Sequence, residues 1–340
     1  MDKKEVVEKV MELFSRLELS NDSLLSKYLF SIFYLAQEYY FNFIDNFPNT
    51  SIGKNIQPRT NLSINDKIDL IEDFYKTYGF PYSINEAVTN GSLDITVNDY
   101  ASETDLYAGK TLGIAKFEGE HIDVQCGDYG TLFDTVSWVH ELAHYNNISK
   151  TNEKENSLLT ESMSFTMTLI YYDYLKERGY TEANDYYIRQ FYSNFLIIEE
   201  YYFFIMFLMI YNETGDIDYE SFKQILGETE HYNDYIENAY SLLLEEELEE
   251  LLWHVLGALR YIIADYISIY LYEEYKEDPS TIERIIRFNE KIKHPTNIVD
   301  ILNTINLPEV DTKEFHEKVL PSLEKFTNRI KNEINLQKTL

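Results

Sequence analysis

The chain has 340 residues, and its 29 Lys and Arg face 59 Asp and Glu, which gives a formal net charge of −30. Such a charge excludes a nucleic-acid-binding protein of the usual kind, because phosphates need a positive surface. With 44% hydrophobic and 26% charged residues, the composition is that of a folded globular protein. The single cysteine, Cys126, excludes an intrachain disulfide and fits a reducing compartment.

Helical periodicity dominates the chain. The first part predicts helices over residues 3–17, 22–47 and 65–78, with a linker rich in Pro, Gly, Asn and Ser at 48–61. Strands are expected at 94–97, 112–117 and 121–126, and helices at 132–146, 157–177, 183–212, 218–226, 233–245, 247–276, 280–293, 297–303 and 312–335. We therefore expect a mostly helical fold with a small β-sheet. Residues 1–60 would form a helical segment that is part of a lobe, and residues 61–340 the catalytic domain.

The chain carries no sign of export or membrane insertion. It begins with charged residues and lacks an apolar stretch near Met1, so we expect no ordinary signal peptide and a cytoplasmic protein, with non-classical export left open. The most apolar run, residues 195–211, is interrupted by Glu199 and Glu200. It is also shorter than the ~20 residues needed to span a bilayer, so we expect a buried helix there.

The most informative motif is His140-Glu141-Leu142-Ala143-His144. On a helix, residues i and i+4 lie one above the other, so both imidazoles can bind one Zn²⁺. Glu141 would then lie beside the metal as a general base, which is the H-E-x-x-H arrangement of metallopeptidases. The flanking residues contain no Gly or Pro and favour the helix that this geometry requires. The alternative is that the two histidines are ordinary polar residues on a solvated helix face.

A catalytic zinc site usually has three protein ligands and one open position. Glu161 is the best third ligand, because it lies among apolar residues one turn inside the predicted helix 157–177, whose N-cap would be Asn156. The loop before that helix turns the chain antiparallel to the motif helix. Glu153 and Glu155 lie in this polar loop and are weaker candidates. Glu161 could instead be a surface residue on a helix.

The run DTVSWVHELAH, from Asp134 to His144, together with TESMSF, from Thr160 to Phe165, resembles the oligoendopeptidase F and thimet oligopeptidase family of gluzincin-type zinc peptidases. The resemblance covers residues 98–335, with a shortened N-terminal region. It implies a gluzincin-like helical fold with the small sheet beside the zinc-site helix, and one Zn²⁺ held by His140, His144 and Glu161. Two departures stand out: Ala143 replaces the usual Gly, and Thr168 replaces a carboxylate expected to support the metal ligands.

In the family that the chain resembles, a His and Tyr residues from a late helix stabilise the oxyanion. The matching positions here are His254 and Tyr266, with Tyr261 as the next candidate. With 30 Tyr in the chain, any one of them can equally be a core residue. A single His on an apolar helix is also often a hydrogen-bonded core residue.

The sequence thus predicts a zinc metallopeptidase that hydrolyses peptides or oligopeptides, with Glu141 as general base and acid and with a peptide or protein as its substrate. Two alternatives stay open. One is a dedicated effector- or toxin-type protease that cuts a specific protein. The other is a catalytically silent helical protein that binds zinc and a partner.

Overall fold

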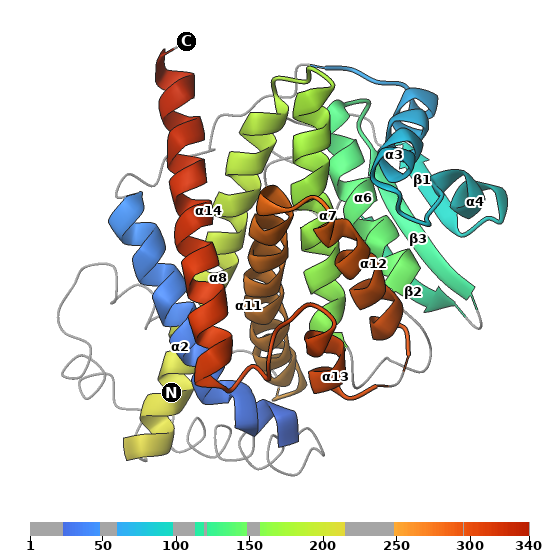
Figure 1. The fold of residues 1–340 in the computed structure, drawn as a ribbon. Coiled ribbons are helices and arrows are strands. Elements are labelled where there is room, and N and C mark those ends of the chain that lie inside the picture. The colour runs from blue at the N-terminus through green and yellow to red at the C-terminus, as the bar shows by residue number, and fades with distance from the viewer. Residues whose placement is uncertain are drawn as a thin grey trace, which may run out of the picture. The chain divides into compact units, whose positions relative to one another are not determined.

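The computed structural model describes residues 23–47, 60–97, 113–118, 121–147, 157–214, 248–294 and 296–339. Within these ranges the protein is mostly helical, with one three-stranded sheet (Figure 1). The helices are α2 (Ser23–Asn46), α3 (Ile64–Tyr78), α4 (Ile84–Thr89), α6 (Leu132–Asn147), α7 (Ser157–Glu177), α8 (Ala183–Thr214), α11 (Leu248–Glu277), α12 (Thr281–Ile292), α13 (Ile298–Asn303) and α14 (Lys313–Thr339). The strands are β1 (Leu93–Val97), β2 (Gly113–Glu118) and β3 (His121–Asp128). The expected mostly helical fold with a small sheet is therefore confirmed.

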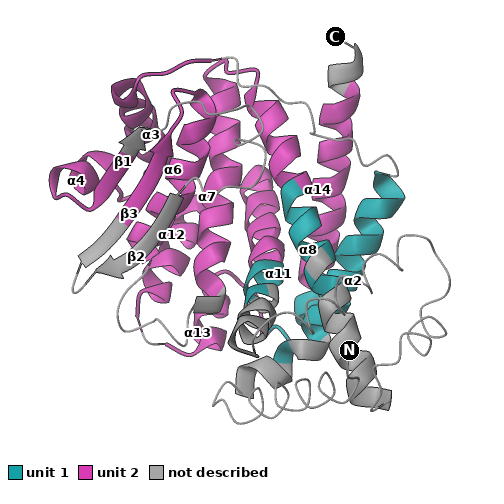
Figure 2. Cartoon of the chain, turned by 180° about the vertical axis from the view of Figure 1, so that it is seen from behind, with its two compact units in different colours: residues 1–48, 193–263, 310–317 teal, residues 49–192, 264–309, 318–340 magenta. Residues whose placement is uncertain are grey.

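The chain divides into two compact units, shown in Figure 2. Unit 1 contains residues 1–48, 193–263 and 310–317, and unit 2 contains residues 49–192, 264–309 and 318–340. All three predicted metal ligands lie in unit 2. The division of the chain at residue 60 stays a prediction.

The sheet of unit 2 has the strand order β1-β3-β2. The central strand β3 pairs in parallel with β1, where Leu93 faces Val124, and antiparallel with β2, where Gly113 faces Cys126. The sheet lies against one side of α6 (Figure 1). The three strands were expected within one or two residues of these bounds, and β2 forms an edge of the sheet beside the motif helix.

N-cap serines mark where the two helices before the sheet begin. Helix α3 begins with a capping box in which the Ser63 hydroxyl accepts from the Asp66 amide at 3.2 Å and the Asp66 carboxylate accepts from the Ser63 amide at 3.3 Å. Helix α4, which periodicity does not reveal, begins with an N-cap serine alone, because the Ser83 hydroxyl accepts from the Glu86 amide at 3.2 Å. The S-x-x-E spacing of Ser83 and Glu86 was the available signal for it.

Helix α6 lies between the sheet and α7 (Figures 1 and 2). Helix α7 matches its predicted bounds and is buried on every side from Leu159 to Leu175, polar residues included. Two of its buried hydroxyls bond the helix backbone: Thr166 donates to the Ser162 carbonyl at 2.6 Å, and Thr168 donates to the Ser164 carbonyl at 2.8 Å. A helix buried all round can carry a polar ligand into the interior of unit 2.

Unit 1 has an aromatic core of its own. Phe43 of α2 stacks on Phe195 of α8 with ring centroids 3.6 Å apart, and Tyr40 stacks on Tyr202 at 5.3 Å.

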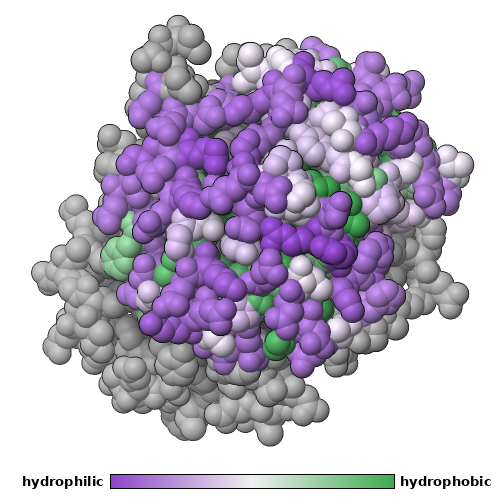
Figure 3. Space-filling model, in the orientation of Figure 1, coloured by the Kyte–Doolittle hydropathy of each residue, from purple (hydrophilic) through white to green (hydrophobic). Residues whose placement is uncertain are grey.

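Among the described residues, no helix is long and apolar enough to cross a membrane. On the face drawn in Figure 3 the described surface is mostly hydrophilic, and its apolar areas are small and separate.

The other predicted helices were placed within a few residues, from α2 to α14. The helices expected at 3–17, 218–226 and 233–245 lie outside the described residues, as does most of the linker expected at 48–61. Helix α14 continues through Pro321, in its third turn, where the proline has no amide hydrogen to donate to the helix.

Candidate metal centre

Helix α6 presents the two histidines of the motif from consecutive turns. The His140 and His144 rings have centroids 5.1 Å apart, and the planes are inclined by 76°. The side chain of His144 is buried, whereas 23% of the His140 side chain is exposed. The pair therefore has one side inside unit 2 and one side open to solvent.

Glu161 of α7 completes the cluster. Its Oε2 atom lies 3.4 Å from Nε2 of His140 and 3.3 Å from Nε2 of His144. One ligand atom from each residue can be chosen so that all three lie within 4.8 Å of one another, and among the described residues this is the one group of this kind. The structure thus brings together the three residues that the sequence analysis proposed as metal ligands.

The buried carboxylate of Glu161 carries a negative charge that a cation can compensate. The side chain is buried, and its Oε2 atom has no hydrogen-bond partner within the described part of the chain. Burial alone would raise the pKa of Glu161, but the neighbouring His144 and His140 outweigh burial and hold this pKa well below its ordinary value. The carboxylate is therefore charged, and it points its free oxygen between two imidazole nitrogens.

These residues fit zinc. Two imidazole nitrogens and one carboxylate oxygen are a ligand set that catalytic zinc accepts, with one further position open. Ligand atoms about 2.0–2.1 Å from a tetrahedral ion lie about 3.3–3.4 Å from each other. The two distances from Glu161 Oε2, 3.4 and 3.3 Å, match that edge length. A cation at this position would also satisfy the otherwise unpaired carboxylate oxygen.

Two further side chains hold the ligands in place. The Ser164 hydroxyl, one turn after Glu161, lies 3.3 Å from Nδ1 and 3.1 Å from Nε2 of His144, and 3.4 Å from the Thr160 carbonyl. The buried Asn147 side chain at the end of α6 donates to the same Thr160 carbonyl at 3.2 Å. In the sequence, Ser164 is marked only by its place in the TESMSF run, and no motif marks Asn147. Thr168, in place of the expected carboxylate, bonds its own helix backbone.

Glu141 follows His140 on the side of α6 that faces the sheet. Burial raises the pKa of the Cys126 thiol on β3, and the nearby Glu141 carboxylate raises it further. Glu141 comes directly after the first ligand on α6 and is partly exposed. A partly exposed carboxylate beside two metal ligands is suited to take and return a proton.

The late-helix residues are described only in part. His254 lies on α11, but its side chain is outside the described residues. Tyr261 belongs to unit 1, where it stacks on Tyr201 with ring centroids 6.3 Å apart. Tyr266 belongs to unit 2 and is fully buried. The oxyanion role of these three residues stays a prediction.

No family model and no curated protein sequence matches the chain. Among solved structures, a crystal structure from Bacillus anthracis strain Ames that is assigned to oligoendopeptidase F is similar, with a TM-score of 0.55. The two sequences are 13% identical, and the match covers 88% of this chain. The chain has an oligoendopeptidase-like fold. It spans 57% of that structure's length. The similarity therefore shows the fold and does not show the activity of the whole protein.

Proposed function

We propose that the protein is a zinc-dependent peptidase that hydrolyses peptide bonds in peptides or oligopeptides. The observation that carries the proposal is the convergence of Glu161 Oε2 on the Nε2 atoms of His140 and His144, at 3.4 and 3.3 Å. The oligoendopeptidase-like fold supports it. One Zn²⁺ per chain would be held by these three side chains.

Each side chain has a separate task in the reaction. When bound, zinc supplies a Lewis acid that polarises the carbonyl under attack and activates water near neutral pH. Glu141 accepts the proton of the attacking water on its carboxylate and delivers it to the leaving amine. Glu161 and His144 are buried and fix the geometry, while the exposed edge of His140 leaves an approach for the substrate. His254, Tyr261 and Tyr266 remain the candidate donors to the oxyanion.

The edge strand β2 is the candidate docking element for the substrate. It packs beside α6 and pairs through its backbone with β3 on one side. An extended peptide can add to such an edge as a further strand, with main-chain hydrogen bonds that do not depend on sequence. This mode of binding suits an enzyme that acts on unstructured peptides.

The test combines metal analysis with a digest of a quenched peptide library. Wild-type protein should contain one zinc per chain and cut short peptides. Glu141→Gln should keep the zinc and lose hydrolysis, because the amide cannot accept the proton. Glu324→Gln, the same substitution at an exposed position of α14, is the matched control and should retain both properties.

Other results point to the alternative functions. Zinc without turnover of any peptide or protein would favour a silent zinc-binding protein. Cleavage of one intact protein, with no activity on the library, would favour a dedicated protease. Metal loss in Glu141→Gln, or unchanged hydrolysis by it, would contradict the role given to Glu141.

A further inference from the structure

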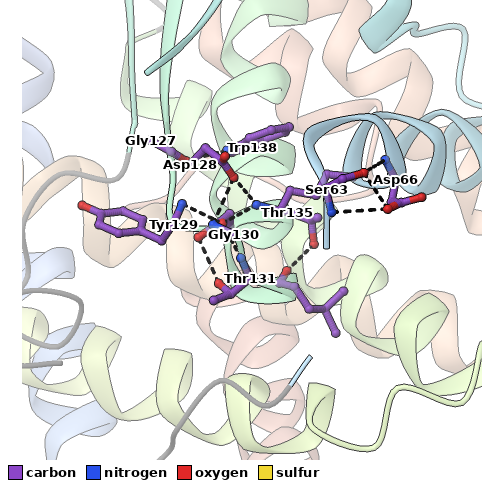
Figure 4. A network of polar contacts seen from close by, with 12 residues as sticks. Ser63, Asp66, Gly127, Asp128, Tyr129, Gly130, Thr131, Thr135 and Trp138 are labelled. Atoms are coloured by element: carbon purple, nitrogen blue, oxygen red, sulfur yellow. Dashed lines mark hydrogen bonds and ion pairs between the residues drawn. The ribbon is translucent and has the colours of Figure 1, made fainter. Parts of the chain in front are cut away.

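A buried ion cluster lies at the beginning of α6, two turns before the first metal ligand. The ammonium of Lys67, on α3, contacts the Asp128 carboxylate at the end of β3 and lies 2.5 Å from Oδ2 of Asp134 in the first turn of α6. The Lys67 side chain is completely buried. Figure 4 shows the polar contacts around Asp128 and the start of α6. A lysine in such a position is rare unless it is paired.

Both carboxylates of the cluster also accept hydrogen bonds from the loop between β3 and α6. Oδ2 of Asp134 accepts from the backbone amides of Tyr129 and Thr131, both at 2.9 Å, and Oδ1 accepts from the Thr131 hydroxyl at 3.1 Å. Oδ1 of Asp128 accepts from the Gly130 amide at 3.2 Å. Buried ion clusters are weak evidence for stability, because apolar side chains of similar volume often stabilise a fold equally well. The directional contacts of this cluster therefore point to a role in fixing geometry.

The cluster contacts one face of α6. Residues at spacings of three and four, such as Asp134, Trp138, Glu141 and Tyr145, share a face of a helix. The Trp138 indole on this face donates to the Gly127 carbonyl of β3 at 2.8 Å, and the Lys67 ammonium lies 5.4 Å from the centre of its ring.

The same face continues past the motif. The Tyr145 hydroxyl accepts from the Asn90 side chain at 3.0 Å, just before β1. Glu141 lies on this face between these attachments. Contacts with Lys67, Gly127 and Asn90 thus hold one face of α6 toward α3 and the sheet.

The metal ligands of α6 lie on a different face, toward α7. His140 and His144 meet Glu161 there. The rotation of α6 about its axis therefore determines the distance of the imidazoles from Glu161. It also determines the position of the Glu141 carboxylate. Side-chain tips lie about 5–6 Å from a helix axis, so a rotation of about 10° moves them by about 1 Å. A displacement of about 1 Å can reduce a reaction rate about 100-fold.

We propose that Lys67, through its contacts with Asp128 and Asp134, is a positioning residue that fixes the rotation of α6 and so aligns Glu141 and the two histidines with Glu161. The proposal rests on the proposed zinc peptidase function for its catalytic consequence. It also concerns the metal-free protein, where the cluster pre-arranges the ligands before an ion binds.

The test uses a charge-free cluster, the triple variant Lys67→Met, Asp128→Asn, Asp134→Asn. Changing Lys67 alone would leave two buried carboxylates without a cation and could unfold the chain. The matched control is Arg329→Met with Glu273→Gln, which removes an ion pair between α14 and α11 whose bonds measure 3.0 and 2.7 Å. Both residues of that pair lie outside α6 and α7, which carry the ligands.

We expect the charge-free variant to keep the denaturant midpoint of the control but to bind zinc at least 10-fold more weakly than the control. The amides of α6 in the metal-free variant should exchange hydrogen at least 10-fold faster than in the control. Its kcat should fall about 100-fold while KM stays within about 3-fold, because Glu141 is misaligned and substrate contacts are kept. Cobalt(II) substituted for zinc should give an altered visible spectrum, since ligand geometry determines it.

Several outcomes would overturn the proposal. If zinc affinity, hydrogen exchange of α6 and kcat all equal those of the control, the cluster is a structural contact that other side chains can replace. If the charge-free variant fails to fold, Trp138→Phe tests the same face, since it removes the bond to the Gly127 carbonyl and part of the buried ring that lies 5.4 Å from the Lys67 ammonium. That variant should bind zinc about 3- to 10-fold more weakly, and unchanged affinity would contradict the inference. Wild-type protein that binds zinc but hydrolyses nothing refutes the proposed function and leaves the affinity and exchange measurements decisive for Lys67.

Discussion

The Ser164 hydroxyl contacts the ring of His144 from one turn beyond Glu161. Nε2 of His144 is turned to Glu161 Oε2, and the Ser164 hydroxyl lies 3.3 Å from Nδ1 and 3.1 Å from Nε2 of the same ring. The hydroxyl can accept from Nδ1–H while it donates to the Thr160 carbonyl, which fixes the tautomer and the ring direction. We predict that Ser164→Ala weakens zinc binding.

The magnitude follows from the kind of contact that is lost. Removal of a hydrogen-bond partner of a metal-ligating histidine reduces metal affinity about 10- to 100-fold, which equals about 1.4–2.8 kcal/mol. The net effect on the metal-free fold should be smaller, on the order of 1 kcal/mol, because only one neutral hydrogen bond is removed. The variant should therefore fold normally and bind zinc poorly.

Ser162 provides the matched control. It lies on the same helix and is equally buried, yet its hydroxyl has no hydrogen-bond partner within the described residues. Ser162→Ala changes helix propensity and volume by the same amount as Ser164→Ala, so these effects cancel in the comparison. It should leave zinc affinity unchanged and raise the free energy of unfolding by about 1 kcal/mol, because an unsatisfied buried hydroxyl disappears.

The assay is competition for zinc against a chromophoric chelator, with urea unfolding of both metal-free variants in parallel. Zinc dissociation constants that agree within about 3-fold between Ser164→Ala and Ser162→Ala would refute the reasoning, since a 10-fold effect is the lower bound. A loss of affinity in both variants would assign the effect to helix packing instead.

Three further predictions test other parts of the molecule. At free zinc about 1,000-fold above Kd, the free energy of unfolding of the wild type should be about 4 kcal/mol higher than after chelation of the metal. The same change should hardly affect His140→Asn, and thermal unfolding measures both. Gly257→Ala would place its Cβ 2.6 Å from the Tyr201 hydroxyl oxygen and should destabilise the fold by about 1 kcal/mol, and adding Tyr201→Phe should recover at least half of this loss. Burial lowers the pKa of His316 below its ordinary value of 6.5, despite opposing effects of a backbone hydrogen bond and a nearby carboxylate. The folded state therefore binds fewer protons than the unfolded state at this site, and stability should fall as pH drops below about 6.5. Urea midpoints at pH 7.5 and 5.5 should show a smaller loss in His316→Gln.

Local signals made much of the fold predictable. The i, i+4 histidines required a helix, and α6 has its predicted start and an end one residue later. The polar loop before α7 suggested an antiparallel return, and Glu161 indeed meets the two histidines. Helix α4 was missed because six residues are too few for periodicity to be recognised, although its S-x-x-E start was present.

The supporting residues escaped prediction for a different reason. Nothing near Lys67 in the sequence marks it as buried, because it lies in an amphipathic helix where a lysine is normally exposed. Its partners Asp128 and Asp134 follow 61 and 67 residues later, and the packing of α3 against the end of β3 and the start of α6 brings them together. Sequence spacing encodes contacts within a helix, whereas contacts between helices depend on which faces meet.

This difference separates the ligands of the site from their alignment. His140, Glu141 and His144 are fixed relative to each other by one helical turn, so their spacing alone indicates zinc chemistry. The direction in which this turn points is set by side chains elsewhere, through hydrogen bonds from a cluster that carries one positive and two negative charges. A chain could keep the motif and lose the activity if that cluster changed. The presence of H-E-x-x-H therefore identifies the candidate metal site, and the Lys67 cluster is the part of the fold on which its activity should depend.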